Sequence, residues 1–212
     1  MKQYLTRRLA RMAGLGGVML VLGAGAFAGP AMAANKFAFA SNLSTSTDTA
    51  ACSAPTLTQP FLSIGDSNLY ALAPGESPDN LTGTGWTLSG GAKIVQTTLA
   101  DGRIGSVLDL PSGATAISPQ LCVTTDYPTA RTLVRDVVGS EGVQMGVSYA
   151  GGTEQTVGQV HGQQTAWTTS NAFNVHPGNQ AGWQLAQFVF VAGGTTSNFQ
   201  IYDFYVDPRA SW

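Results

Sequence analysis

Short stretches in which apolar and polar residues alternate run through most of the chain after residue 51. In residues 143–149, Val, Met, Val and Tyr occupy every second position, which is the period of a strand with one buried face. Residues 183–191 are more continuously apolar, which is typical of a strand covered on both faces. From residue 51 onward, no window keeps the three- and four-residue spacing of a helix for more than one turn. The pattern therefore predicts strands and no convincing helix.

Turn-forming pairs separate these stretches, among them Pro74-Gly75, Gly90-Gly91, Asp101-Gly102 and Gly193-Gly194. Strand-sized pieces between such turns, without helices, indicate an antiparallel sandwich or barrel. About a dozen short strands fit a jelly roll with two sheets of roughly four or five strands each, plus edge pieces. The absence of an internal sequence repeat argues against a propeller or solenoid. We predict an all-β fold, an antiparallel β-sandwich of the jelly-roll type, in a single domain over residues 51–212.

The last predicted strand poses a question about Asp203. Simple alternation puts Tyr202, Phe204 and Val206 on one face, and Phe199, Ile201, Asp203 and Tyr205 on the other. A carboxylate on such an apolar face is costly unless it has a partner. We expect that partner to be a cation, an arginine such as Arg131 or Arg135, or backbone N–H groups.

The first 33 residues have the order of an export signal, with a basic stretch in residues 2–11, an apolar stretch in residues 12–27 and then Ala31-Met32-Ala33. The apolar stretch is shorter than the roughly 20 residues of a membrane-spanning helix. We therefore predict cleavage after Ala33, secretion, and no membrane span in the mature chain. Arg7-Arg8 leaves a twin-arginine signal as the alternative to the ordinary secretory route.

Residues 34–50 are rich in Ala, Ser, Thr and Asn and carry little apolar periodicity. This composition predicts a flexible leader ahead of the domain.

Removal of the signal makes the chain more acidic. The full sequence has 10 basic and 12 acidic residues, and the predicted mature chain keeps six basic residues against all 12 acidic ones. No cluster of Lys and Arg remains, so nucleic acid is excluded as a partner on charge grounds.

Cys52 and Cys122 are the two cysteines of the sequence. An even pair in an exported chain predicts a disulfide. A metal site is the alternative, but two cysteines without a CxxC motif or a nearby histidine do not make one.

Several segments carry a resemblance, and they are Gly85–Ala92, Leu108–Ala114, Ser118-Pro119 before Cys122-Val123, Pro128–Arg131 and the ending Ile201–Pro208. Together they are similar to an uncharacterised family of small secreted bacterial β-sandwich proteins, over nearly the whole domain. The Gly-Trp-x-Leu element and the closing strand also resemble galactose-binding-like jelly rolls, the fold of many carbohydrate-binding modules. The first resemblance implies no activity, and the second is an analogy of fold.

Jelly rolls of the galactose-binding type often hold a structural calcium ion between an early loop and the final strand. This resemblance makes Asp66 and Asp203 candidate ligands for Ca²⁺, which prefers carboxylate and carbonyl oxygens. A salt bridge or hydrogen bonds to these carboxylates are the alternative. We expect no other cofactor.

Aromatic side chains are the candidates for stacking against a sugar. Trp86 and Trp183 are expected in the core, because large aromatics at alternating positions usually pack inside. Trp167 lies in a polar setting beside Gln163, which makes it the best candidate for an exposed platform. We name Trp167, Tyr127 and Gln163 as candidate ligand-binding residues.

The sequence Ile64-Gly65-Asp66-Ser67 resembles the nucleophile block of the Gly-Asp-Ser esterases. That chemistry needs a base near the serine, and neither His161 nor His176 has the Asp three residues earlier that the family uses. The esterase fold also requires helices. We therefore assign no catalytic residue.

We expect a secreted, non-catalytic β-sandwich that binds a carbohydrate or another extracellular ligand, such as a polysaccharide or a cell-wall component. The alternative is a structural or cell-envelope protein without a small ligand. A hydrolase acting on a glycan or an ester is the second alternative, because glycoside hydrolysis needs only two suitably spaced carboxylates.

Overall fold

The computed structural model describes residues 43–44, 46–127, 129–149, 155–175 and 181–207. The predicted signal peptide, most of the predicted leader and His176 lie outside these residues. Among the described residues, the helical structure amounts to one three-residue turn, η1 (Leu62–Ile64), and no helix is long and apolar enough to cross a membrane.

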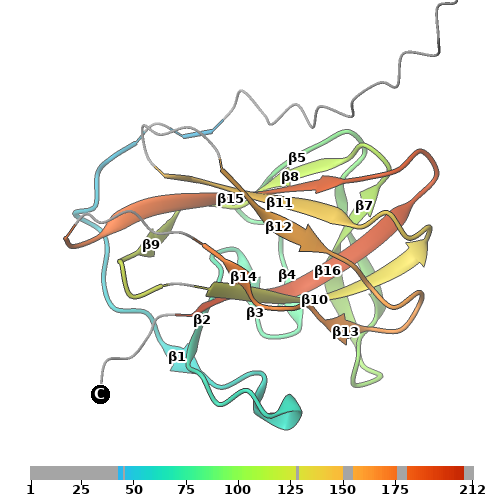
Figure 1. Ribbon diagram of the computed structural model, residues 1–212, viewed down its shortest axis with the longest axis horizontal. Coiled ribbons are helices and arrows are strands. Elements are labelled where there is room, and N and C mark those ends of the chain that lie inside the picture. The colour runs from blue at the N-terminus through green and yellow to red at the C-terminus, as the bar shows by residue number, and fades with distance from the viewer. Residues whose placement is uncertain (1–42, 45, 128, 150–154, 176–180, 208–212) are drawn as a thin grey trace, which may run out of the picture. The chain divides into compact units, whose positions relative to one another are not determined.

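An eight-stranded sheet forms one layer of the molecule (Figure 1). Its strands are β1 (Leu57–Thr58), β2 (Tyr70–Leu72), β6 (Lys93–Thr98), β7 (Ile104–Pro111), β10 (Thr129–Val138), β13 (Thr168–Thr169), β14 (Phe173–Asn174) and β16 (Asn198–Asp207). The long strand β16 pairs with β10 along one edge, and with β7 and then β2 along the other. Every pairing in this sheet is antiparallel.

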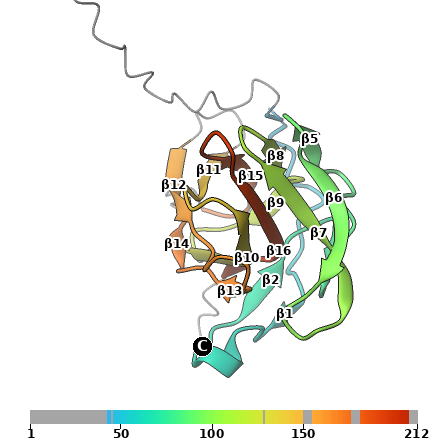
Figure 2. The same cartoon turned by 90° about the vertical axis from the view of Figure 1, so that its right-hand side faces the viewer.

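A six-stranded antiparallel sheet forms the second layer (Figure 2). A short hairpin packs against β7 and β16 of the first sheet. The strands of the six-stranded sheet are β5 (Thr87–Ser89), β8 (Thr115–Ile117), β9 (Leu121–Val123), β11 (Val143–Tyr149), β12 (Gln155–Val160) and β15 (Gln184–Ala192). The hairpin consists of β3 (Glu76–Ser77) and β4 (Asn80–Leu81). The predicted fold class, an all-β antiparallel sandwich of the jelly-roll type, is confirmed.

The two sheets contain more strands than expected, because in each sheet one long strand pairs with several short strands. On one edge β15 pairs with β11, and on the other it pairs with β8 and β9 in turn. Two-residue strands of this kind leave almost no alternation in a sequence, so the pattern of apolar residues undercounts them.

The core lies between the sheets and contains aromatic rings from both of them. Phe204 of β16 packs against Phe188 and Phe190 of β15, with ring centroids 4.8 and 5.2 Å apart. Trp86 is 9% exposed and lies 5.7 Å from Phe190, which confirms its predicted place in the core. The half-buried Trp183 packs against the same cluster.

The predicted disulfide is present. Cys52 and Cys122 are bonded, with their Cα atoms 5.6 Å apart and 70 residues apart in sequence. The bond joins the segment before β1 to β9, and therefore ties the N-terminal side of the domain to the six-stranded sheet.

Candidate functional site

The outer face of the eight-stranded sheet carries the candidate site, and strand β10 shows how the sequence builds that face. Its residues alternate strictly in burial from Thr129 to Asp136. Ala130 and Val134 point into the core, whereas Leu133 and Arg135 are half-buried on the opposite face. This outer face is only partly covered by other segments, so a ligand can reach it.

Strand β16 departs from simple alternation at Asp203, and the predicted faces of this strand are wrong beyond Tyr202. Tyr205 pairs with Arg131, and Tyr202 pairs with Leu133. Between these two pairs, β16 therefore contains one residue more than β10. This is a β-bulge, in which an extra residue reverses which face the following side chains take. Asp203 has φ +53°, a conformation that Asp adopts more readily than most residues.

The bulge changes which side chains form the outer face. Phe199, Ile201, Phe204 and Val206 all belong to the core between the sheets. Tyr202 packs with Leu99 and Val107 on the outer side instead, and Tyr205 packs there with Phe61 and Tyr70. The core therefore receives two residues on each side of the bulge.

Hydrogen bonds hold the bulge in place. The N–H of Asp79 donates to Oδ1 of Asp203 over 2.9 Å, and the N–H of Phe204 donates to Oε2 of Glu76 over 3.1 Å. The partner that Asp203 was expected to need is thus a backbone N–H group. Burial raises the pKa of Glu76 well above its ordinary value, because its carboxyl oxygens are shielded from water.

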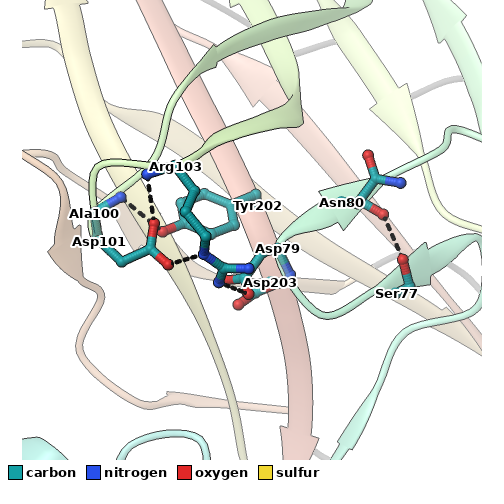
Figure 3. A network of polar contacts seen from close by, with 8 residues as sticks. All are labelled: Ser77, Asp79, Asn80, Ala100, Asp101, Arg103, Tyr202 and Asp203. Atoms are coloured by element: carbon teal, nitrogen blue, oxygen red, sulfur yellow. Dashed lines mark hydrogen bonds and ion pairs between the residues drawn. The ribbon is translucent and has the colours of Figure 1, made fainter.

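A network of charged groups borders Asp203 (Figure 3). The guanidinium of Arg103 contacts the carboxylates of both Asp79 and Asp101. The N–H of Arg103 also donates to Oδ1 of Asp101 over 2.9 Å, and the N–H of Ala100 donates to the hydroxyl of Tyr202 over 3.2 Å. The β6–β7 turn is thereby fixed against β16.

The pKa values of these carboxyl groups move in opposite directions. Burial raises the pKa of Asp203 from 3.8 to about 6, and the charges of Asp79 and Asp101 add to this effect. Hydrogen bonds from the backbone and the side chain of Arg103 lower the pKa of Asp101. Burial and the neighbouring negative charges thus disfavour the charged form of Asp203. Asp101 is exposed, and its charged form is favoured by Arg103.

A glycine allows Asp79 to reach this site. A Cβ atom at Gly105 of β7 would lie 2.3 Å from the carbonyl oxygen of Asp79 and 2.4 Å from Cδ1 of Leu99. No side chain fits in that space, so the loop between β3 and β4 can lie directly against β7.

These elements enclose an open pocket of about 240 Å³ on the outer face of the sheet. Its lining consists of Pro60, Phe61, Ser63, Ile64, Asp79, Ala100, Asp101, Leu133, Thr169, Tyr202 and Asp203. Phe61, Ile64 and Leu133 are apolar members of this lining, and Asp79, Asp101 and Asp203 contribute three carboxylates. Ser63 and Thr169 add hydroxyl groups.

Trp167 lies on the same face, but it is packed rather than free. Its Nε1–H donates to the carbonyl of Thr98 over 2.8 Å, and its ring lies edge-on to Tyr202 with centroids 4.6 Å apart. The guanidinium carbon of Arg135 is 4.6 Å from the centroid of the Trp167 ring. Trp167 thus supports the Tyr202 side of the pocket. It was expected as an exposed platform, and in the structure it is half-buried.

The other two predicted ligand-binding residues lie elsewhere. Gln163 is exposed and forms an isolated β-bridge with Ala166, next to Trp167 in sequence. Tyr127 is 5% exposed and packs against Trp183, and its accessible part lines a different pocket beside Cys122. The structure therefore does not bring Tyr127 together with Trp167 and Gln163.

The predicted calcium ligands Asp66 and Asp203 take different partners. Oδ2 of Asp66 lies 3.0 Å from Nε of Arg131 and accepts a 2.7 Å hydrogen bond from the hydroxyl of Tyr70. A guanidinium thus occupies the place that a cation would take at Asp66. Among the described residues, no group of three His, Cys, Asp or Glu side chains could hold a metal ion.

Ser67 and His161 also lie in different surroundings. The carbonyl of Ser67 accepts a hydrogen bond from Gln59 over 2.7 Å. His161 is exposed after β12, and its ring approaches Gly142, where a Cβ atom would lie 2.6 Å from Cε1.

Sequence reasoning missed most of the pocket. Leu133 and Thr169 carried no signal, because one apolar and one hydroxyl residue in a strand are ordinary. Asp101 was visible only as part of an Asp-Gly turn, and Arg103 follows it closely. Besides Asp203, which the pattern of the last strand had singled out, this charged turn was a further sign of the pocket.

No protein-family model and no curated protein matches this chain. Solved structures with similar folds include the CBM22-1 xylan-binding domain from Paenibacillus barcinonensis, with 15% identity, coverage of 66% of this chain and 94% of that chain, and a TM-score of 0.44. A C-terminal family 22 carbohydrate-binding module from Clostridium thermocellum has 17% identity, coverage of 60% and 88%, and a TM-score of 0.42. TmCBM61, solved with β-1,4-galactotriose, has 21% identity, coverage of 59% and 92%, and a TM-score of 0.38.

All three are carbohydrate-binding modules. Identities and TM-scores this low say nothing of what this chain binds.

Proposed function

We propose that this protein binds a carbohydrate, without acting on it, in the pocket on the outer face of the eight-stranded sheet. The observation that carries the proposal is the composition of that pocket, whose lining combines apolar side chains with carboxylates and hydroxyls. A sugar ring has the same division, since its C–H faces are apolar and its rim consists of hydroxyl groups. Small-ligand sites generally combine an apolar lining with a few polar groups that fix orientation.

The disulfide supports an extracellular place for this function. Disulfides persist in oxidising compartments and are rare in the cytosol, and Cys52 and Cys122 are bonded. Together with the export signal expected in residues 1–33, this favours a secreted protein that meets polysaccharides outside the cell.

A pocket-filling variant tests the proposal. Ala100 is exposed and lines the pocket, so Ala100→Trp should obstruct it without disturbing the core. We expect the wild-type chain to be retained on at least one glycan of a polysaccharide panel, and Ala100→Trp to lower the affinity by about tenfold or more, or roughly 1.4 kcal/mol.

Ala181→Trp is the matched control, because Ala181 is exposed and outside the pocket lining. It should bind as the wild type does. Failure of the wild type to bind any glycan would overturn the proposal, and so would unchanged binding by Ala100→Trp. In either case the exposed side chains of Leu62 and Ile64 would point to contact with another macromolecule.

A further inference from the structure

We infer that a second site, beside the disulfide, binds a small uncharged ring compound that carries one hydrogen-bonding oxygen. This site is a cleft of about 250 Å³, which we call the edge cleft. It shares no lining residue with the pocket on the outer face of the eight-stranded sheet, so it does not depend on the proposed carbohydrate binding.

The edge cleft takes its lining from both layers of the sandwich. Residues 71–72 of β2 and Val206 of β16 come from the eight-stranded sheet, and residues 121–123 of β9 come from the six-stranded sheet. The segment 51–55 also contributes, and the bond between Cys52 and Cys122 fastens it to β9. Separate parts of the chain are thus fixed around one space, as in other preformed small-molecule sites.

The lining is free of charge. The side chains that form it all belong to the described residues, and none of them is ionised. Its more exposed apolar members include Pro55, Leu72 and Pro74, and its buried ones include Leu121 and Val206. An ion placed here would lose water without gaining a counter-charge, which is unfavourable. The lining therefore selects an uncharged and mostly apolar ligand.

The volume of the edge cleft sets the size of that ligand. An apolar protein cavity of about 150 Å³ is large enough to bind benzene. At about 250 Å³, the edge cleft has room for one such ring with a short substituent. A sugar is less suited to it, because the lining offers the many hydroxyls of a sugar only the polar side chains of Ser53, Gln120 and Tyr127.

Tyr127 supplies the polar contact for the ligand. This residue is 5% exposed and lines the edge cleft, and its ring packs against Trp183 with centroids 6.3 Å apart. Its hydroxyl makes no hydrogen bond to any described residue and is not fully enclosed. Polar atoms of side chains buried to this degree are nearly always paired. The hydroxyl is therefore free to bond to an oxygen of a ligand in the edge cleft.

Burial also keeps this hydroxyl in its donor form. It raises the pKa of Tyr127 above the ordinary value of 10.0, and the charge of Asp126 adds to the effect. The hydroxyl consequently stays protonated at neutral pH, and it can donate to a carbonyl or ether oxygen.

Three benzene derivatives of similar size test the inference. Acetophenone has a ring and one carbonyl oxygen, ethylbenzene lacks the oxygen, and benzoate adds a negative charge. Each is titrated near neutral pH against the full chain with its disulfide intact, and NMR chemical shifts report the binding. Acetophenone should bind about fivefold more tightly than ethylbenzene, the effect expected of one hydrogen bond, and benzoate should not bind measurably.

Tyr127→Phe removes the hydroxyl but keeps the ring that packs against Trp183. It should lower the affinity for acetophenone to that for ethylbenzene, and leave the affinity for ethylbenzene unchanged. Since the hydroxyl has no partner among the described residues, the midpoint of urea unfolding without ligand should also stay unchanged. A loss of binding would then not come from unfolding.

Ala51→Trp should obstruct the edge cleft and lower the affinity for acetophenone about tenfold or more, because Ala51 is exposed and belongs to the lining. Ala54→Trp is the matched control, since Ala54 is exposed, three residues farther along the chain and outside the lining. It should bind acetophenone as the wild type does.

Failure of acetophenone to bind would overturn the inference, and so would unchanged binding by Ala51→Trp. A preference for acetophenone that is absent in the wild type, or that survives in Tyr127→Phe, would also overturn it, because the hydroxyl would then bond only to water. Ala100→Trp, which obstructs the pocket on the outer face, should leave acetophenone binding intact. A loss of glycan binding in that variant and a loss of acetophenone binding in Ala51→Trp therefore report on separate sites.

Discussion

Asp203 makes the folded chain sensitive to pH, because its pKa rises from 3.8 to about 6 on folding. Between these values the folded chain holds a proton that the unfolded chain has released. The free energy of unfolding therefore falls as the pH rises through this window. The shift corresponds to about 3 kcal/mol when fully expressed.

We predict that Asp203→Asn is more stable than the wild type above about pH 6 and that the difference disappears below about pH 4. Asn has no charge to desolvate, tolerates the positive φ of +53° and keeps an acceptor for the N–H of Asp79. Urea unfolding at both pH values measures the effect, with Asp126→Asn as the control. A constant difference between the two pH values would contradict the prediction.

The partner or the burial of a single residue could be predicted from sequence where the chemistry of that residue was sufficient to determine it. Cys52 and Cys122 had no other partner, and Trp86 was too large and apolar to lie outside. The partner of Asp203 was not predictable, because the N–H of Asp79 comes from 124 residues away. A backbone N–H group was among the expected partners of Asp203, but the sequence did not show that it would be that of Asp79.

At the scale of the element, the bulge in β16 decides which aromatic rings lie on the outer face of the eight-stranded sheet. Without the extra residue, Tyr202 would not lie on the same side of the strand as Tyr205, and Phe204 would leave the core. Both phases of alternation give an apolar face in Phe199–Val206, so the sequence pattern alone could not reveal the change of phase.

We predict that Asp203→Val loses about 1–3 kcal/mol more stability than Asp203→Gly. Valine is β-branched and resists positive φ, whereas glycine adopts it freely. Both variants lose the carboxylate and its hydrogen bond to Asp79, so the difference between them reports the backbone conformation. Chemical denaturation measures it, and equal midpoints would show that the bulge does not require this conformation.

At the scale of the whole molecule, the pocket is assembled from segments that are remote in sequence. Its lining comes from η1 and the residue pair before it, the β3–β4 loop, the β6–β7 turn and the strands β10, β13 and β16. Alternation predicted that such strands exist, but not which of them are neighbours. The fold class could therefore be predicted from sequence, whereas the site could not.

The disulfide is expected to stabilise the molecule as a whole. A bond between residues 70 apart in sequence restricts the unfolded chain, and the chain-entropy model gives a contribution of up to about 4 kcal/mol. We predict a loss of this order in the Cys52→Ser, Cys122→Ser double variant, measured by urea unfolding. Wild-type protein in reductant should lose a similar amount, and an unchanged midpoint in both would contradict the prediction.

The segment around this bond spans both layers of the sandwich. Leu43 packs on Val189 and Val191 on the outer side of the six-stranded sheet, and the N–H of Ser44 donates to Gln187 over 2.6 Å. Farther along, β1 pairs with β2 in the eight-stranded sheet. Tension applied ahead of Leu43 would peel away these first contacts and then stop at the covalent bond of Cys52. From there the load would divide between the disulfide, which leads through β9 into β15 of the six-stranded sheet, and the backbone, which leads into β1 of the eight-stranded sheet.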